Sequence, residues 1–284
     1  ISDAQKALFK EEGYFILENA MPTHHLELLR SESQTFIDKA DAQMDAEGTD
    51  SLGLNHRNSR YFVSNCFREQ PRLREFLFSD LMAEICQGAL GDDVYLFWEQ
   101  YVVKGAEAGK EFSWHQDSGY VGYPEHKRYL TCWCALDDMS EQNGTVHLLP
   151  FSRAGMRTWV HHIRDEESGD KIGYFGSDPG LPVVAPAGSI AVFTSYNFHS
   201  SGTNPTDRMR RVYLAQYSCE PLTSADGSKL WGNAEPFLLG GESAVGSARR
   251  RPSVAAHALR EMTTPRAFLS CVYEVAPHVT PSAA

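Results

Sequence analysis

Short segments rich in β-branched and aromatic residues begin at Val94, and they constrain the fold more than any other feature of the sequence. They span residues 94–103, 129–136, 145–149, 188–194 and 211–218. Thr131, Trp133 and Ala135 alternate with apolar residues in one of them, and Asn143-Gly144 is a strong turn signal before another. A set of about six to eight such strands predicts an antiparallel sandwich or barrel, so the fold class is mainly β.

The residues before Val94 show helical spacing instead. Ser2 and Gln5 fit a capping box, and Gly13 can end the helix that they open. The remaining pattern predicts a strand at 14–17, a helix after Pro22, a surface loop across 41–60 and a further helix across 71–90. A flank of N-terminal helices, about residues 1–92, therefore precedes the β core.

One domain is predicted for all 284 residues, because no repeat, low-complexity tract or linker divides the chain. The β core takes about 93–219. The segment 151–182 inside it and the C-terminal segment 220–284 hold few periodic runs, so each is expected to form a lid or a wrapping loop.

The composition argues against several classes of function. Lys and Arg number 26 and Asp and Glu 37, a formal charge of −11 that opposes binding to nucleic acid or to an anionic membrane surface. The sequence has no run of about 18 apolar residues, so no membrane span is predicted. The six cysteines lack the spacing of a zinc site and the density of a secreted disulfide scaffold, which favours free thiols in a cytoplasmic protein. The chain begins at Ile1 rather than Met, which is compatible with a removed leader.

Eleven histidines make any single one weak evidence for a site. Four of them lie in polar or helical surroundings and are expected at the solvated surface: His24, His25, His161 and His162. His115 differs, because Asp117 follows it by two residues, and residues two apart on a strand project to the same face. The two side chains can therefore meet one metal ion, and a plain hydrogen-bonded pair is the alternative.

His199 is the best candidate for a further ligand. It follows the apolar strand 188–194 and precedes the turn-rich segment 200–205, which places it at a strand edge. Two histidines and one carboxylate form a facial triad that leaves three coordination positions of Fe(II) open, enough for a bidentate cosubstrate and O2. Because His115 and His199 lie 84 residues apart and must meet, the core is expected to fold back on itself as one unit.

The landmarks extend beyond these three residues. Arg210 follows His199 by eleven positions, and two longer motifs are Phe9-x-x-x-Gly13-Tyr14-Phe15-Ile16-Leu17 and Asp137-Asp138-x-x-x-x-x-Gly144-Thr145-Val146-x-Leu148-Leu149-Pro150. Together they resemble the phytanoyl-CoA dioxygenase (PhyH) family, whose members are Fe(II)- and 2-oxoglutarate-dependent oxygenases. The resemblance covers most of the chain, from about residue 5 to 219. It implies a double-stranded β-helix, or jelly-roll, core with flanking N-terminal helices.

The resemblance also implies roles for individual residues. His115, Asp117 and His199 would bind Fe(II), and Arg210 would hold the distal carboxylate of 2-oxoglutarate with its guanidinium fork. Arg208 and Arg211 compete with Arg210 for that role. Further cosubstrate contacts are expected at Ser201, Gln100, Trp133 and Thr131. For Trp133 and Thr131, plain core packing is the alternative. O2 is the second cosubstrate, and ascorbate can serve as reductant.

The implied reaction is hydroxylation of an aliphatic C–H bond of a small molecule, with release of succinate and CO2. Asp117 favours hydroxylation over halogenation, because related halogenases carry a small residue at that position. A cupin-like zinc hydrolase with the same three ligands and a non-catalytic jelly-roll binding module are the alternatives. Loop residues are the candidates for substrate contact: Tyr120, Tyr123, His56, Arg57 and Arg153. The sequence leaves the substrate and the oligomeric state open.

Overall fold

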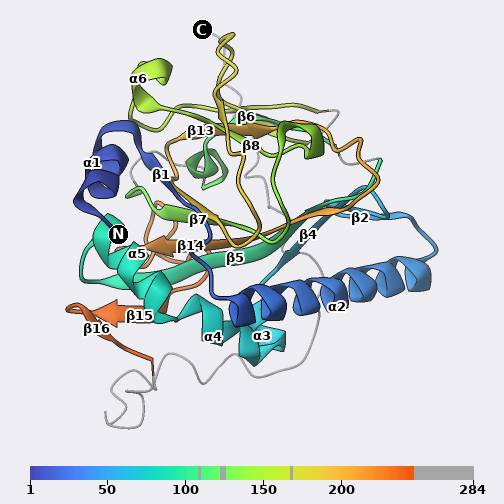
Figure 1. Cartoon of the computed structure of the whole chain (residues 1–284), viewed down its shortest axis with the longest axis horizontal. Coiled ribbons are helices and arrows are strands. Elements are labelled where there is room, and N and C mark those ends of the chain that lie inside the picture. Colours follow the sequence, from blue (N-terminus) through green and yellow to red (C-terminus); the bar gives the residue numbers. More distant parts are fainter. Residues whose placement is uncertain (108–109, 122–125, 167–168, 246–284) are drawn as a thin grey trace, which may run out of the picture. The chain divides into compact units, whose positions relative to one another are not determined.

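Two antiparallel sheets form the centre of the structure (Figure 1). The computed structural model describes residues 1–107, 110–121, 126–166 and 169–245. The large sheet runs in the order β1 (Tyr14–Leu17), β12 (Ile190–Thr194), β7 (Leu130–Ala135), β14 (Arg210–Ser218), β5 (Val94–Lys104), β4 (Arg60–Ser64), β3 (Asn55–His56) and β2 (Ser51–Leu52). The small sheet runs in the order β11 (Leu181–Pro182), β8 (Val146–Leu149), β13 (Phe198–Ser201) and β6 (Phe112–His115). A separate pair consists of β9 (Ile163–Arg164) and β10 (Lys171–Ile172).

All five strands predicted after Val94 form, with ends shifted by no more than two residues. Strand β7 lies between β12 and β14, although both follow it much later in the chain. Strand β13 likewise lies between β8 and β6. Within each of the two facing sheets, strands from early in the chain pair with strands from late in the chain. This is the arrangement of a jelly roll. The predicted mainly β class and jelly-roll core are therefore confirmed.

Helices occupy the N-terminal flank, as predicted. They are α1 (Asp3–Glu12), α2 (Thr23–Glu47), α3 (Cys66–Glu69), η1 (Pro71–Leu73), α4 (Arg74–Leu77) and α5 (Asp80–Leu90). The predicted capping box of Ser2 and Gln5 opens α1, and Gly13 ends it with a φ of 82°. Three short helices lie in loops of the β core: η2 (Asp117–Tyr120), η3 (Glu141–Asn143) and α6 (Phe151–Ala154).

Three local predictions in this flank differ from the structure. The segment 41–60 is not a loop throughout, because α2 continues to Glu47 and β2 and β3 follow. Met44 is fully buried on the same helical face as Ile37, and this packing outweighs the polar composition of the segment. His25, expected at the surface, is buried in α2 with its ring 5.6 Å from that of Phe76. The helix expected across 71–90 forms in pieces, as η1, α4 and α5.

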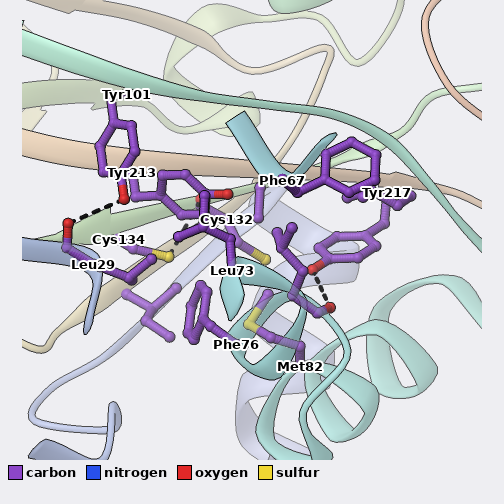
Figure 2. Packing of buried hydrophobic residues seen from close by; sticks show 14 of the residues in the cluster. Leu29, Phe67, Leu73, Phe76, Met82, Tyr101, Cys132, Cys134, Tyr213 and Tyr217 are labelled. Carbon is purple, nitrogen blue, oxygen red and sulfur yellow. Dashed lines mark hydrogen bonds between the residues drawn. The ribbon is translucent and has the colours of Figure 1, made fainter. Parts of the chain in front are cut away.

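The outer face of the large sheet packs against the helical flank (Figures 1 and 2). Tyr101 of β5 donates a hydrogen bond to the carbonyl of Leu29 in α2 at 3.0 Å. Tyr217 of β14 donates to the carbonyl of Leu77 in α4 at 2.7 Å. Both hydroxyls thus have hydrogen-bond partners inside an apolar core, where a buried hydroxyl without a partner would be costly. The core fixes the helices to the sheet.

The inner face of the large sheet packs against the small sheet. Val102, Trp133, Phe193 and Val212 of the large sheet belong to one apolar cluster with Leu148 of the small sheet. Successive residues of a strand point to opposite faces, so both faces of β7 are buried. This double burial explains why residues 129–136 carry apolar or small side chains on both faces.

The C-terminal segment is only partly described. Strand β15 (Glu235–Leu239) pairs with β5 and with β16 (Glu242–Ser243), so part of this segment joins the large sheet. Residues 246–284 of the expected lid lie outside the described residues, and the single-domain boundaries stay a prediction. None of the helices within the described ranges combines the length and the apolar composition that a membrane span requires.

Gly144 occupies a position that only glycine fits. Its φ is +70°, and a Cβ there would lie 2.5 Å from the carbonyl oxygen of Thr203 and against that of Gly202. Gly155 has the same φ, but none of the described residues places an atom within 4 Å of a Cβ at that position. We expect Gly155→Ala to cost about 1–2 kcal/mol from backbone strain and Gly144→Ala about 2–5 kcal/mol from strain plus overpacking. Urea unfolding of both variants measures the difference, and equal losses would contradict the packing argument.

Candidate active site

Two histidines face each other across the small sheet. His199 of β13 is the direct Cα partner of His115 of β6. Side chains directly opposite each other in an antiparallel pair lie on the same face, and the two ring centroids are 4.2 Å apart. The sheet register thus brings together two residues that are far apart in the sequence.

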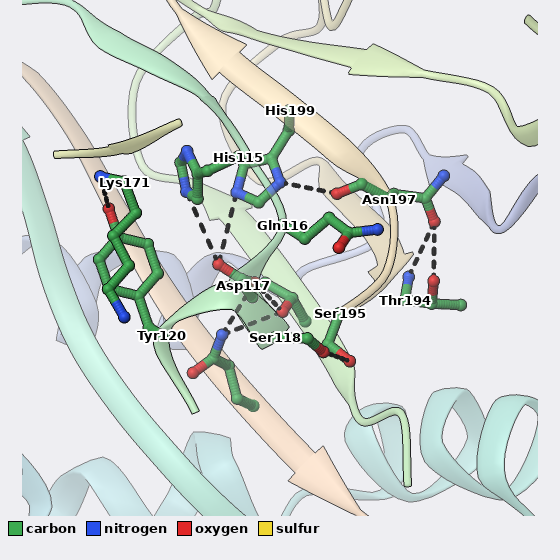
Figure 3. A network of polar contacts seen from close by, with 12 residues as sticks. His115, Gln116, Asp117, Ser118, Tyr120, Lys171, Thr194, Ser195, Asn197 and His199 are labelled. Atoms are coloured by element: carbon green, nitrogen blue, oxygen red, sulfur yellow. Dashed lines mark hydrogen bonds and ion pairs between the residues drawn. The ribbon is translucent and has the colours of Figure 1, made fainter. Parts of the chain in front are cut away.

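Asp117 completes a cluster with these histidines (Figure 3). It is the first residue of η2, immediately after β6. Its Oδ1 lies 3.4 Å from Nε2 of His199 and 3.9 Å from Nε2 of His115. One ligand atom from each residue falls within 4.8 Å of the others, which is close enough for all three to bind one ion.

The backbone fixes which nitrogen of each histidine faces the cluster. Nδ1 of His115 lies 2.7 Å from the carbonyl oxygen of Ser113, and Nδ1 of His199 lies 3.1 Å from that of Asn197. We infer that each Nδ1–H donates to its carbonyl, so that each Nε2 keeps a lone pair directed at the cluster. Burial, together with the neighbouring His199, lowers the pKa of His115 to about 3. The imidazole of His115 is therefore neutral, as a metal ligand must be.

The two oxygens of Asp117 have different partners. Oδ2 accepts hydrogen bonds from the Thr131 hydroxyl at 2.6 Å and from Nε2 of Gln216 at 3.0 Å. Oδ1 is left to face the histidines. Burial alone would raise the pKa of Asp117, but the neighbouring His199 and His115 and the hydrogen bond from Thr131 hold it at about 2. The cluster therefore carries one ionised carboxylate and offers the donor set of a divalent metal.

Arg210 is a buried cation on the inner face of the large sheet. Its side chain is 2% exposed, and Nη2 donates to the carbonyl of Gly144 at 2.9 Å. Nε and Nη1 have no hydrogen-bond partner among the residues that the structure describes. The guanidinium lies 5.7 Å from the ring centroid of Trp133, and burial lowers its pKa to about 10. A buried guanidinium with two unpaired nitrogens is costly unless an anion binds there, so this position fits a carboxylate.

A second buried basic side chain lies next to Arg210. Lys104 of β5 is its direct Cα partner, and Nζ of Lys104 donates to the carbonyl oxygens of Ser201, at 3.3 Å, and of Gly202. Burial and the nearby Arg210 lower the pKa of Lys104 to about 6. Arg60 of β4 is the Cα partner of Lys104 on its other side. Three basic residues thus form a row across β4, β5 and β14, and Arg210 is the one that stays charged with two nitrogens facing no described partner.

Comparison with known proteins identifies the family. The sequence model of the phytanoyl-CoA dioxygenase (PhyH) family matches residues 9–212. The chain belongs to the PhyH family. It is 26% identical to L-proline trans-4-hydroxylase of Streptomyces griseoviridis over 56% of this chain and 65% of that one. It is 27% identical to a probable alpha-ketoglutarate-dependent hypophosphite dioxygenase of Stutzerimonas stutzeri over 59% of this chain and 60% of that one. The matched part is thus less than two thirds of either relative.

Solved structures agree on the fold. The crystal structure of EctD from S. alaskensis with 2-oxoglutarate and 5-hydroxyectoine superposes with a TM-score of 0.59. The two chains are 20% identical, and the match covers 86% of this PhyH-family chain and 84% of EctD. At this identity the likeness supports the jelly-roll architecture alone.

The other residues expected to bind the cosubstrate lie on the strands around the cluster of this PhyH-family chain. Ser201 is on β13, two residues after His199 and on the same face. Trp133 stacks against the Arg210 guanidinium. Thr131 instead donates to Asp117, a contact that the sequence did not reveal. Gln100 accepts from the Ser64 hydroxyl at 3.3 Å. Cosubstrate contacts at these residues stay predictions.

The residues expected to contact the substrate are scattered. The ring of Tyr120 lies 5.4 Å from that of His115, so this residue does lie beside the cluster. Arg57 instead forms ion pairs with Asp45 and Asp50. Arg153 pairs with Asp178 in the same way. His56 is half-buried on β3, and Tyr123 lies outside the described residues.

Sequence reasoning missed three residues around the site. Gln216 binds Asp117, Lys104 lies beside Arg210, and His162, expected at the surface, is buried against the metal-ligand loop. Gln216 could have been identified as a site residue from the sequence. It is a polar residue six positions after Arg210, so it lies on the same face of β14. No sequence pattern identifies His162, because a loop outside the regular strands brings it into place.

Proposed function

We propose that the protein is an Fe(II)- and 2-oxoglutarate-dependent dioxygenase. It hydroxylates an aliphatic C–H bond of a small molecule and releases succinate and CO2. The observation that carries this proposal is the buried guanidinium of Arg210, two nitrogens of which have no partner among the described residues, in a chain that also holds a His-Asp-His cluster. A metal site alone fits many reactions, but a metal site with a buried carboxylate receptor fits a cosubstrate acid. Family membership and the 2-oxoglutarate bound in EctD support the same conclusion.

Nε2 of His115, Nε2 of His199 and Oδ1 of Asp117 would hold the iron. Two imidazoles and one ionised carboxylate form the 2-His-1-carboxylate set that suits Fe(II) and leaves three positions open. When bound, iron supplies the activation of O2 that is coupled to decarboxylation of 2-oxoglutarate. Ascorbate can keep the iron reduced between turnovers.

Arg210 would bind the distal carboxylate of 2-oxoglutarate through Nε and Nη1, the two nitrogens that lack a partner. Its Nη2 is already held by Gly144, so the guanidinium plane is fixed before the cosubstrate arrives. Trp133 limits the guanidinium on one side, and Lys104 lies beside it on the neighbouring strand. Ser201 and Gln100 remain the candidates for further polar contacts. The chain's part in the reaction is thus orientation of the cosubstrate and exclusion of water.

The two alternatives leave observations unexplained. A zinc hydrolase could use the same three ligands, but it has no need of a buried arginine with unpaired nitrogens. A binding module without activity has no need of two histidines whose Nε2 atoms converge on a carboxylate. Asp117 also fills the position at which a halogenase would bind halide, so hydroxylation is favoured.

Succinate formation tests the proposal. Protein loaded with Fe(II), ascorbate and 2-oxoglutarate is incubated in air with a panel of amino acids, small osmolytes and acyl thioesters. We expect at least one compound to raise succinate release well above the background without substrate. Relatives named for L-proline and ectoine place amino-acid-like compounds first in the panel. Hydrolysis with zinc, and no succinate with iron, would overturn the proposal.

Small molecules are the partners expected of such an enzyme, and the charge of −11 argues against a nucleic-acid or anionic membrane partner. We place the protein in the cytoplasm. The support is that the cysteines of the described residues, Cys66, Cys86, Cys132, Cys134 and Cys219, are free thiols, as a reducing compartment keeps them.

The hydrogen bond from Thr131 to Asp117 predicts a measurable effect on metal binding. Thr131→Val removes the donor but keeps the shape, so the carboxylate loses a partner that orients it. We expect Fe(II) affinity to fall about 10-fold to 100-fold, the usual effect of losing such a partner. Thr145→Val is the matched control, because Thr145 is equally buried and donates to Val183 away from the cluster. Anaerobic calorimetry compares the two, and equal Fe(II) affinities would contradict the prediction.

A further inference from the structure

His162 lies outside the cluster but contacts the residue between two of its ligands. The backbone N–H of Gln116 donates to Nε2 of His162 at 2.9 Å. Nδ1 of His162 lies 2.8 Å from the carbonyl oxygen of Val160, so both ring nitrogens have a partner and the tautomer is fixed. The side chain is 8% exposed, and burial lowers its pKa, so the ring is neutral. Gln116 is thus held by an acceptor from a different loop.

Two glycines close on the His162 ring. A Cβ at Gly119 would lie 2.5 Å from the ring, and a Cβ at Gly173 would lie 2.7 Å from its Cε1. Gly119 belongs to η2, two residues after Asp117, and the N–H of Gly173 donates to the carbonyl of Trp114 at 2.9 Å. The imidazole is therefore wedged between the metal-ligand loop and the chain after β10, where it has no room to rotate.

The Gln116 side chain extends the same contacts to the third ligand. Its Nε2 donates to the carbonyls of Thr158, at 2.9 Å, and of Tyr196, at 2.7 Å. Its Oε1 accepts from the N–H of Val160 at 3.0 Å. Tyr196 directly precedes Asn197, whose carbonyl oxygen lies against Nδ1 of His199. Both donors and the oxygen of this amide are bonded, and the amide links the loop of His115 and Asp117 to the turn before His199.

We propose that His162 is a positioning residue that, through Gln116, sets the spacing of the three metal ligands. It would touch neither metal nor substrate. The inference rests on the proposed function in one respect, because it assumes that the cluster binds Fe(II). Loss of the acceptor at Nε2 would free the peptide between His115 and Asp117, whereas loss of the contact to Val160 alone would not.

Two substitutions separate these contacts. In His162→Gln the amide reaches the place of Nε2 and can still accept from the Gln116 N–H. In His162→Asn the amide ends at the place of Nδ1, so it keeps the contact with Val160 and loses the acceptor. His161→Asn is the matched control, because His161 is the exposed neighbour in the same loop. Thermal unfolding of each apo variant shows that it is folded at the temperature of the titrations.

The measurement is anaerobic calorimetry with Fe(II) alone, followed by the visible spectrum after addition of 2-oxoglutarate. We expect His162→Asn to bind Fe(II) about 10-fold to 100-fold more weakly and to give an altered charge-transfer band. His162→Gln and His161→Asn should resemble the unmodified protein. Should His162→Asn not fold, His162→Met replaces it, with the same weakening expected, because an apolar side chain fills the space and cannot accept from the Gln116 N–H.

Two outcomes would overturn the inference. If His162→Asn, or His162→Met in its place, binds Fe(II) as tightly as the unmodified protein and merely unfolds at a lower temperature, the role is structural only. If His162→Gln is as weak as His162→Asn, the acceptor is not what matters. Absence of Fe(II) binding by the unmodified protein would instead refute the proposed function, so the two failures are distinguishable.

Discussion

Asp117→Ala is expected to weaken Fe(II) binding by at least about 100-fold and to reduce succinate formation to background. Asp117 is ionised while His115 is neutral, so this substitution removes the negative charge of the cluster as well as a ligand. Loss of an outer partner of a ligand already costs about 10-fold to 100-fold in metal affinity, so loss of a ligand itself should cost more. The substitution leaves the rest of the site intact, since Gln216 and Thr131 lie 3.0 Å apart and can bond to each other.

The control removes a carboxylate elsewhere. Asp178→Ala breaks the ion pair with Arg153 but leaves the cluster unchanged. Fe(II) affinity is measured by anaerobic calorimetry, and succinate is measured in air with excess iron. Fe(II) binding by Asp117→Ala that matches Asp178→Ala would show that the cluster is not the iron site.

Arg210→Met is expected to weaken 2-oxoglutarate binding by at least about 30-fold. Removing one partner of a buried, hydrogen-bonded charge pair costs about 2–5 kcal/mol, and each 1.4 kcal/mol is a factor of ten. Without its anion, however, the buried guanidinium lacks partners at Nε and Nη1. Replacing an unpaired buried charge by an apolar side chain of similar length should therefore leave the apo protein at least as stable.

Arg211→Met is the matched control, and it should show the opposite pattern. Arg211 is the next residue on β14, points to the other face and pairs with Asp137 at 2.7 Å. Its loss should cost at most about 1 kcal/mol of stability, as for other partly exposed ion pairs, and leave 2-oxoglutarate affinity unchanged. Calorimetry and urea unfolding of both variants separate the effects. Unchanged 2-oxoglutarate affinity in Arg210→Met would remove Arg210 from the site, and weaker binding by Arg211→Met instead would favour Arg211.

Much of the fold was predictable because the signals are local. Alternation in 129–136 and the capping box at Ser2 depend on neighbouring residues only, and both appear in the structure. The segment 41–60 was mispredicted for the opposite reason. Its helix continues because Met44 packs into a core that distant strands complete.

The site residues, like the fold, separate into those that local sequence patterns predict and those that only distant contacts bring into place. His115 and Asp117 form a short motif, and the strand pattern placed His199 near them, so the cluster was predictable. The partners that orient these ligands come from other strands and loops. Gln216 and His162 lie 99 and 46 residues from the groups they bond, and only the folded register brings them together. Sequence patterns with a period of two or 3.6 residues carry no record of such contacts.

An anaerobic titration of the unmodified protein tests the central claim most directly. Fe(II) is added first and 2-oxoglutarate second, and the visible spectrum is recorded at each step. Chelation of the iron by 2-oxoglutarate should give a charge-transfer band that saturates at one iron per chain. No band, with Fe(II) left free or bound without response to 2-oxoglutarate, would contradict the account.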